Sequence, residues 1–329
     1  MFAPHSFTTA FLMMLVSTVC YGSWGNTYKL TKGFRFELFY WDYLVGIFAG
    51  ALALALTIGS SPFNASSFLP NVRSAGLSNI VCAMTGGVIF SLAILLLLAG
   101  IHLAGLSVSF PVSTGIAVAL GVILGYVFEP KGNPALLALG VVSTLIAVVL
   151  AGKAYAGLGH VQTNVSRKGL FVCAASGIVM GLFPPFVARA LTSGKVLGPY
   201  GISVFFSLGA LVGSFVTNVY FMKQPIVGEP VGFADFVTAP RKYHLLGFLG
   251  GLIVGLGMVF NFVAAGFAGV AISYAVGQAA PMVAAMWGIF LWKEFSGSGT
   301  KTKTYLALTF LFYFLALALI AHARSAASV

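Results

Sequence analysis

Long apolar runs decide what this chain can fold into. Residues 45–58 and 306–320 contain no charged side chain, and similar runs recur along the sequence. A helix needs about 20 apolar residues to cross the hydrocarbon core of a bilayer, and it satisfies its own backbone polar groups. A transmembrane β-barrel would show short segments of alternating hydrophobicity instead. The runs therefore predict an all-α integral membrane protein.

The composition excludes the soluble alternatives. Hydrophobic residues make up 59% of the 329 residues and charged residues 7%, whereas a soluble domain carries about 25% charged residues. Intrinsic disorder needs low hydrophobicity and high charge, which is the opposite pattern. Ten membrane helices would use about 200 residues and leave no room for an added soluble domain. We expect one transmembrane domain over residues 1–329.

Polar and proline-containing breaks divide the chain into ten predicted spans. We place them at 7–25, 38–58, 77–101, 106–127, 135–156, 169–191, 200–221, 245–266, 268–292 and 304–322. Spans three and four are joined only by Ala104-Gly105, and spans eight and nine only by residues 266–268. Each of these pairs should form a tight helical hairpin.

The basic residues predict an orientation and not a nucleic-acid site. The 17 Lys and Arg residues are scattered over the connections and form no patch. Twelve of them fall in the first, fifth, seventh and ninth connections, and five fall on the other side. By the positive-inside rule, the odd connections face the cytoplasm of a plasma-membrane protein, and both termini lie outside.

The two halves of the sequence resemble each other. Residues 103–112 and 267–276 share Ala, Gly, Ser and Val at an offset of 164. Residues 17, 22 and 24 are Ser, Gly and Trp, and residues 176, 181 and 183 are Ser, Gly and Phe. Five spans per half is an odd number, so the second half must insert upside down. We expect an inverted 5+5 repeat, about 1–157 and 168–325, as in many secondary transporters.

Several short motifs resemble a known transporter family. They are Tyr40-Trp41-Asp42-Tyr43, the stretch 83–92, Gly105-Leu106-Ser107-Val108 and Pro111-Val112-Ser113-Thr114-Gly115. With ten spans in a 5+5 duplication, they resemble the drug/metabolite transporter superfamily, and within it the ureide permease family and its sugar-transporting relatives. The resemblance implies proton-coupled uptake of a small neutral polar solute, ureide or nucleobase-like, with a sugar as the alternative. Plant members carry a nucleotide-binding motif in a long central loop, and this chain has none.

Polar residues on spans four and nine are the main candidates for substrate binding. Phe110 and Thr114 are four residues apart and share a helix face, as do Ser109 and Ser113. Their counterparts in span nine include Tyr274 and Gln278. Pro111 and Pro281 should loosen both helices and free carbonyls for a ligand. The competing interpretation is that these side chains only join neighbouring helices.

Further candidates come from the other spans. Trp24 and Asn26 end span one, and Phe183 precedes a Pro-Pro pair that should break span six. Trp24 and Phe183 could contact a substrate ring from two sides, or they could pack together as a gate. Weaker candidates are Thr85, Ser91 and Asn261.

Asp42 is the one acidic residue placed inside a predicted span. A carboxylate at this depth in the membrane costs free energy unless it is paired with another group or reached by water. It is either a proton-coupling carboxylate or an interfacial acid paired with Lys29 or Arg35. Glu129 and Glu294 end spans four and nine and are expected to be structural.

We expect neither a membrane enzyme nor a channel. The remaining acids and the histidines lie in loops or at span ends and form no catalytic cluster. The three cysteines have no metal-ligand spacing, so we expect no metal and no cofactor. A channel is disfavoured because no ring of charges or filter motif is present. With no ATP-hydrolysing site, the expected partners are a small-molecule substrate, a proton or other ion gradient and the lipid bilayer, and the oligomeric state is left open.

Overall fold

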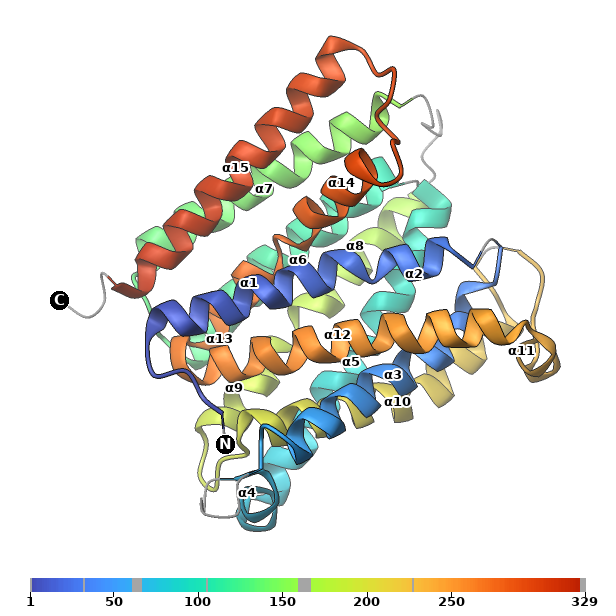
Figure 1. Cartoon of the computed structure of the whole chain (residues 1–329). Helices are drawn as coiled ribbons and strands as arrows, with labels where there is room; N and C mark the ends of the chain where they lie inside the picture. Colours follow the sequence, from blue (N-terminus) through green and yellow to red (C-terminus); the bar gives the residue numbers. More distant parts are fainter. Residues whose placement is uncertain are drawn as a thin grey trace.

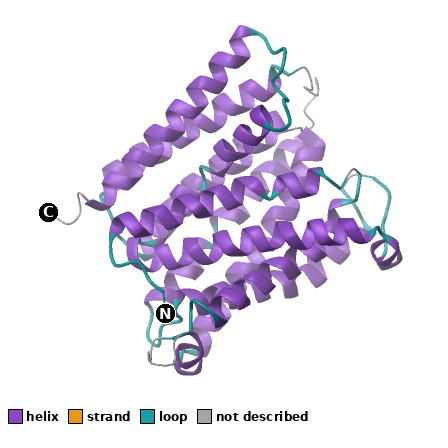
Figure 2. Ribbon diagram, viewed as in Figure 1, coloured by secondary structure: helices purple, strands orange, loops and turns teal. Residues whose placement is uncertain are grey.

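The computed structural model describes residues 2–31, 33–60, 67–104, 106–158, 167–226 and 228–325. Within these ranges every regular element is a helix (Figure 2). The helices are α1 (Phe7–Ser23), α2 (Gly25–Lys29), α3 (Phe36–Leu56), α4 (Phe68–Ser74), α5 (Leu77–Ala104), α6 (Leu106–Phe128), α7 (Pro134–Ala156), α8 (Arg167–Gly181), α9 (Pro184–Thr192), α10 (Pro199–Lys223), α11 (Phe233–Thr238), α12 (Arg241–Ala268), α13 (Val270–Gly277), α14 (Ala280–Phe290) and α15 (Thr300–Ser325).

The ten predicted spans are confirmed. Ten stretches of the described chain are long and apolar enough to cross a membrane, from Phe7–Lys29 to Thr300–Ala323. The predicted tight turn between spans eight and nine is also confirmed, because Gly269 alone separates α12 from α13. Its φ of 101° lies in the left-handed region that favours glycine. Gly105, in the other predicted hairpin, lies outside the described residues.

The helices form one bundle with distinct ends (Figure 1). The start of α1, the end of α15 and α4 lie at one end, and α2, α11 and the connection from α14 to α15 lie at the other. The most extensive helix pairs are α3 with α12, α7 with α15, and α5 with α10. The α7–α15 pair forms an outer layer beside the rest of the bundle.

Three of the spans are interrupted near their middle or end. The first breaks at Trp24, the sixth between Gly181 and Pro184, and the ninth between Gly277 and Ala280. The predicted loosening at Pro281 and the predicted break at the Pro-Pro pair are therefore confirmed, since proline removes a helical hydrogen bond. The expectation for Pro111 is wrong to the extent that α6 runs through it without interruption.

Glycines allow two pairs of helices to touch backbone to backbone. A Cβ at Gly251 of α12 would lie 2.0 Å from the carbonyl oxygen of Tyr43 in α3. A Cβ at Gly87 of α5 would lie 1.8 Å from the carbonyl oxygen of Phe206 in α10. Only a residue without a side chain fits at these two crossings.

Gly251→Ala is expected to lower the stability of the protein by about 1–3 kcal/mol, because the backbone of α3 would have to move. Gly25→Ala is the matched control, since a Cβ there meets nothing within 4 Å. Thermal unfolding of the purified proteins in detergent measures the difference. Equal midpoints for the two variants would contradict close packing at this crossing.

Candidate functional site

A cavity of about 190 Å³ lies at the level of the helix breaks. Its lining comes from both halves of the chain and from eight of the spans. No Asp, Glu, Lys, Arg or His is among the described residues that line it. The site therefore suits a neutral molecule.

The structure brings many of the predicted binding residues together around this cavity. Those that line it are Trp24, Ser113, Thr114, Phe183, Asn261, Tyr274 and Gln278. The side chain of Phe110 lies outside the described residues. Residues from spans one, four, six, eight and nine thus converge on one volume.

Two predicted candidates on spans one and three face elsewhere. The Asn26 side chain accepts a hydrogen bond from Trp292 Nε1 at 2.7 Å. The Thr85 hydroxyl donates to the Val81 carbonyl of its own helix at 2.8 Å. Both polar groups are thus satisfied within the protein, away from the lining of the cavity.

Two predicted serines join helices at the periphery of the site. Ser91 Oγ is buried and accepts a hydrogen bond from the Tyr40 hydroxyl at 3.2 Å. Ser109 Oγ lies 3.3 Å from Cys173 Sγ of α8. Ser109 and Ser113 do face the same neighbour, α8, but only Ser113 reaches the cavity.

The polar groups of the cavity differ in how far the protein satisfies them. Asn261 Nδ2 donates to the Ser273 carbonyl at 3.2 Å, and the Tyr274 hydroxyl donates to the Ala117 carbonyl at 3.2 Å. No hydrogen bond from the described residues involves the side-chain amide of Gln278, which sits at the break between α13 and α14. This amide is the group most available to a ligand.

Aromatic rings form much of the wall. The Trp24 and Tyr43 ring centroids are 4.9 Å apart, and Phe183 lies 5.4 Å from both Tyr274 and Phe206. Trp24 and Phe183 line the same cavity with different ring partners. Flat apolar faces beside a few polar groups are typical of small-molecule sites.

Sequence reasoning missed several of the wall residues. Tyr21, Tyr43, Phe90 and Phe206 line the cavity. The chain has 30 Phe and 12 Tyr, so an aromatic residue in an apolar run carries little positional information. Tyr43 alone had a signal, as part of the Tyr40–Tyr43 motif.

Asp42 lies outside the cavity and is paired with a histidine. Its Oδ2 is 2.8 Å from Nδ1 of His244, at the start of α12. The expected pairing with Lys29 or Arg35 is wrong. Lys29 pairs with Glu294, and Arg35 contacts Glu37 of its own segment.

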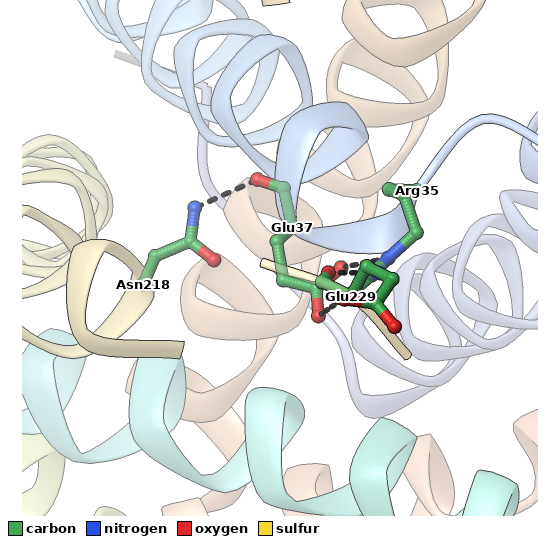
Figure 3. Close-up of polar contacts among 4 residues, drawn as sticks. All are labelled: Arg35, Glu37, Asn218 and Glu229. Atoms are coloured by element: carbon green, nitrogen blue, oxygen red, sulfur yellow. Dashed lines mark hydrogen bonds and ion pairs between the residues drawn. The ribbon is translucent and has the colours of Figure 1, made fainter. Parts of the chain in front are cut away.

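A second cavity, of about 260 Å³, lies at the α2 end of the bundle beside a polar network (Figure 3). Arg35 Nη2 and Nε donate to the two carboxylate oxygens of Glu37 at 2.8 and 3.1 Å. Arg35 Nη1 also donates to the Glu229 carbonyl at 2.6 Å. Asn218 Nδ2 donates to the Glu37 carbonyl at 2.8 Å, so the network ties α3 to α10 and to the α10–α11 connection.

Glu129 holds the opposite end of the bundle together. It is 5% exposed, and its Oε2 accepts a hydrogen bond from the Val270 N–H at 3.0 Å. Its Oε1 lies 2.7 Å from Lys131 Nζ. A carboxylate at the first residue of α13 also complements the helix dipole. The hydrogen bond from Val270 ties the end of α6 to the start of α13, and the contact with Lys131 lies within the α6–α7 connection.

Comparison with known proteins places the chain in a family. The family model described as ureide permease matches residues 39–164 and 160–323. Ureide permease 1 of Arabidopsis thaliana is 26% identical over 88% of this chain and 90% of the relative. Ureide permease 2 of the same plant is 25% identical over 91% and 92%.

The fold is also similar to that of a protein in a solved crystal structure. That protein is 16% identical, with a TM-score of 0.62 over 98% of this chain and 99% of the other. The sequence match over most of the chain is the decisive finding. This multi-pass membrane protein belongs to the ureide permease family.

Proposed function

We propose that this protein is a secondary transporter of the plasma membrane that takes up a small, neutral, polar solute of the ureide or nucleobase type together with protons. The uncharged central cavity carries the proposal. It combines ring faces with the hydroxyl of Thr114 and with the amide of Gln278, which makes no hydrogen bond to the described residues. An amide pairs well with the adjacent N–H and C=O groups of a ureide. The relatives are named ureide permeases, which supports the same substrate class.

A ligand-dependent thermal shift tests the substrate class. A ligand that binds only the folded protein stabilises it by mass action, by about 2.7 kcal/mol at 100 times Kd. We expect cyclic ureides or nucleobases to raise the melting temperature of the purified protein and hexoses to leave it unchanged. Stabilisation by a hexose, with no effect of ureides or nucleobases, would overturn the proposed substrate class.

The Asp42–His244 pair is the proposed coupling site. It bridges α3 and α12, with 2.8 Å between the carboxylate oxygen and the imidazole nitrogen, and both side chains are of types that carry protons in membrane proteins. A carboxylate–imidazole pair can therefore bind and release a proton during the cycle. Acidic and histidine side chains within membrane spans commonly serve this purpose.

We also propose the inverted repeat. In such a repeat, α3 corresponds to α10, α12 to α5, and α7 to α15. The contacting pair α3–α12 then corresponds to the contacting pair α10–α5, and the pair α7–α15 corresponds to itself. The glycines at the two closest crossings, Gly87 and Gly251, differ by 164 positions. That is the offset at which the sequence halves resemble each other. Both observations support a duplication.

The proposed orientation, with both termini outside, predicts opposite labelling at two exposed positions. In a background with Cys20, Cys82 and Cys173 replaced by Ala, Ser74→Cys should react with an impermeant maleimide on intact cells. Thr238→Cys should react only after permeabilisation. The basic connections then face the cytoplasm. The reverse pattern would place both termini inside.

A further inference from the structure

We infer that Ser113 and Tyr274 offer the substrate fixed hydrogen-bond acceptors, and that Ser176, outside the cavity lining, sets the polarity of Ser113. The cavity then selects a substrate by the N–H groups along its edge. The inference rests on the proposed function, because it concerns how the same cavity chooses its substrate.

The direction of the serine hydrogen bonds follows from a carbonyl. Ser176 Oγ lies 2.9 Å from the Ala93 carbonyl oxygen, and Ser113 Oγ lies 2.9 Å from Ser176 Oγ. A carbonyl only accepts, so Ser176 must donate its single hydroxyl hydrogen to Ala93. Ser113 must then donate its own hydrogen to Ser176. Only the lone pairs of Ser113 Oγ remain for a molecule in the cavity.

The direction of the Tyr274 hydrogen bond is fixed in the same way. Its hydroxyl hydrogen is donated to the Ala117 carbonyl at 3.2 Å, which leaves the oxygen as an acceptor. Ala117 follows Ser113 by four residues, so both positions lie on one face of α6. Two acceptor oxygens therefore belong to the same wall of the cavity.

The break in the sixth span adds to this wall. Pro184 and Pro185 carry no N–H, so the carbonyls of Met180 and Gly181 lose the donors that a continuous helix would supply. Met180 lines the cavity. The C-terminal end of α8 also carries the negative end of its helix dipole. Each of these features favours a donor on the substrate.

Gln278 completes the match to a urea-like edge. Its amide offers both an N–H donor and a carbonyl acceptor, and it is not used by the described protein residues. The substrate C=O and one neighbouring N–H can pair with the N–H and C=O of the Gln278 amide, while the second N–H of the substrate donates to the fixed acceptors. A molecule with an acceptor in place of that N–H would meet lone pairs.

Two ring compounds of the same size test the inference on the unmodified full-length protein. Imidazolidin-2-one is a cyclic urea with two N–H groups, and 2-oxazolidinone has a ring oxygen in place of one of them. Isothermal titration calorimetry should give at least about tenfold weaker binding for 2-oxazolidinone, because a donor is lost and an acceptor is left unpaired. Equal affinities would overturn the inference and leave the proposed function standing.

Two serine variants distinguish an effect on the hydrogen-bond direction of Ser113 from an effect on helix packing. Both variants remove the hydrogen bond between Ser113 and Ser176, so they should disturb the packing of α6 against α8 to the same extent. Ser113→Ala should weaken imidazolidin-2-one binding about tenfold and leave 2-oxazolidinone unchanged. Ser176→Ala frees the Ser113 hydrogen to turn into the cavity. It should leave imidazolidin-2-one binding within about threefold of the parent and strengthen 2-oxazolidinone binding.

The binding results for the two variants and the unmodified protein distinguish failure of the inference from failure of the proposed function. If both variants lower both affinities in the same proportion, Ser176 has only a structural role and the inference fails. If the unmodified protein binds neither ring, the proposed function fails and the inference fails with it. Weaker imidazolidin-2-one binding in Ser113→Ala, together with stronger 2-oxazolidinone binding in Ser176→Ala, supports both the inference and the proposed function.

Discussion

Asp42→Asn is expected to abolish accumulation of substrate against its gradient while leaving exchange of substrate across the membrane intact. Asparagine keeps the size of the side chain and can still hydrogen-bond to His244, whose Nδ1 lies 2.8 Å from Oδ2 of Asp42. It cannot bind and release a proton, so the charge state can no longer follow the gradient. Proteoliposomes with an imposed pH gradient measure accumulation, and counterflow measures exchange.

Glu129→Gln is the matched control for this prediction. It removes a carboxylate that is also paired, with Lys131 and the Val270 N–H as partners. Because Glu129 joins helix ends at the opposite end of the bundle, its loss should lower stability and leave coupling unchanged. Accumulation by Asp42→Asn with the pH dependence of the parent would show that Asp42 only fastens α3 to α12.

Features that depend on local sequence were predictable. The spans follow from apolar runs of fixed length, and the breaks at Pro184–Pro185 and Pro281 follow from the missing N–H of proline. The turn at Gly269 follows from the shortness of the connection. In each case the residues that determine the structure lie within a few positions of it.

Features that depend on helix contacts were less predictable. His244 is 202 residues from Asp42, and no charge pattern in the sequence distinguishes it from the nearer Lys29 and Arg35. Ser109 and Ser113 are alike in type and spacing, yet only Ser113 reaches the cavity. Depth along the helix, and not the face alone, decides which serine meets the substrate.

Gln278→Ala is expected to reduce substrate affinity about 5- to 150-fold with folding intact. The amide is partly buried beside the cavity, and none of the described residues hydrogen-bonds to it. Removing it leaves the polar edge of the substrate unpaired, which costs about 1–3 kcal/mol. The described part of the protein loses no hydrogen bond, so the melting temperature without substrate should stay close to that of the parent.

Gln224→Ala is the matched control, because this exposed glutamine accepts only a 3.4 Å hydrogen bond from Tyr220 and lies outside the cavity lining. It should leave affinity unchanged. Titration calorimetry with a cyclic ureide on both purified variants measures the difference, and uptake in proteoliposomes provides a second measurement. Unchanged binding and uptake in Gln278→Ala would show that the glutamine only fills the break between α13 and α14. The loss of affinity without loss of stability is what separates a binding residue from one that joins helices.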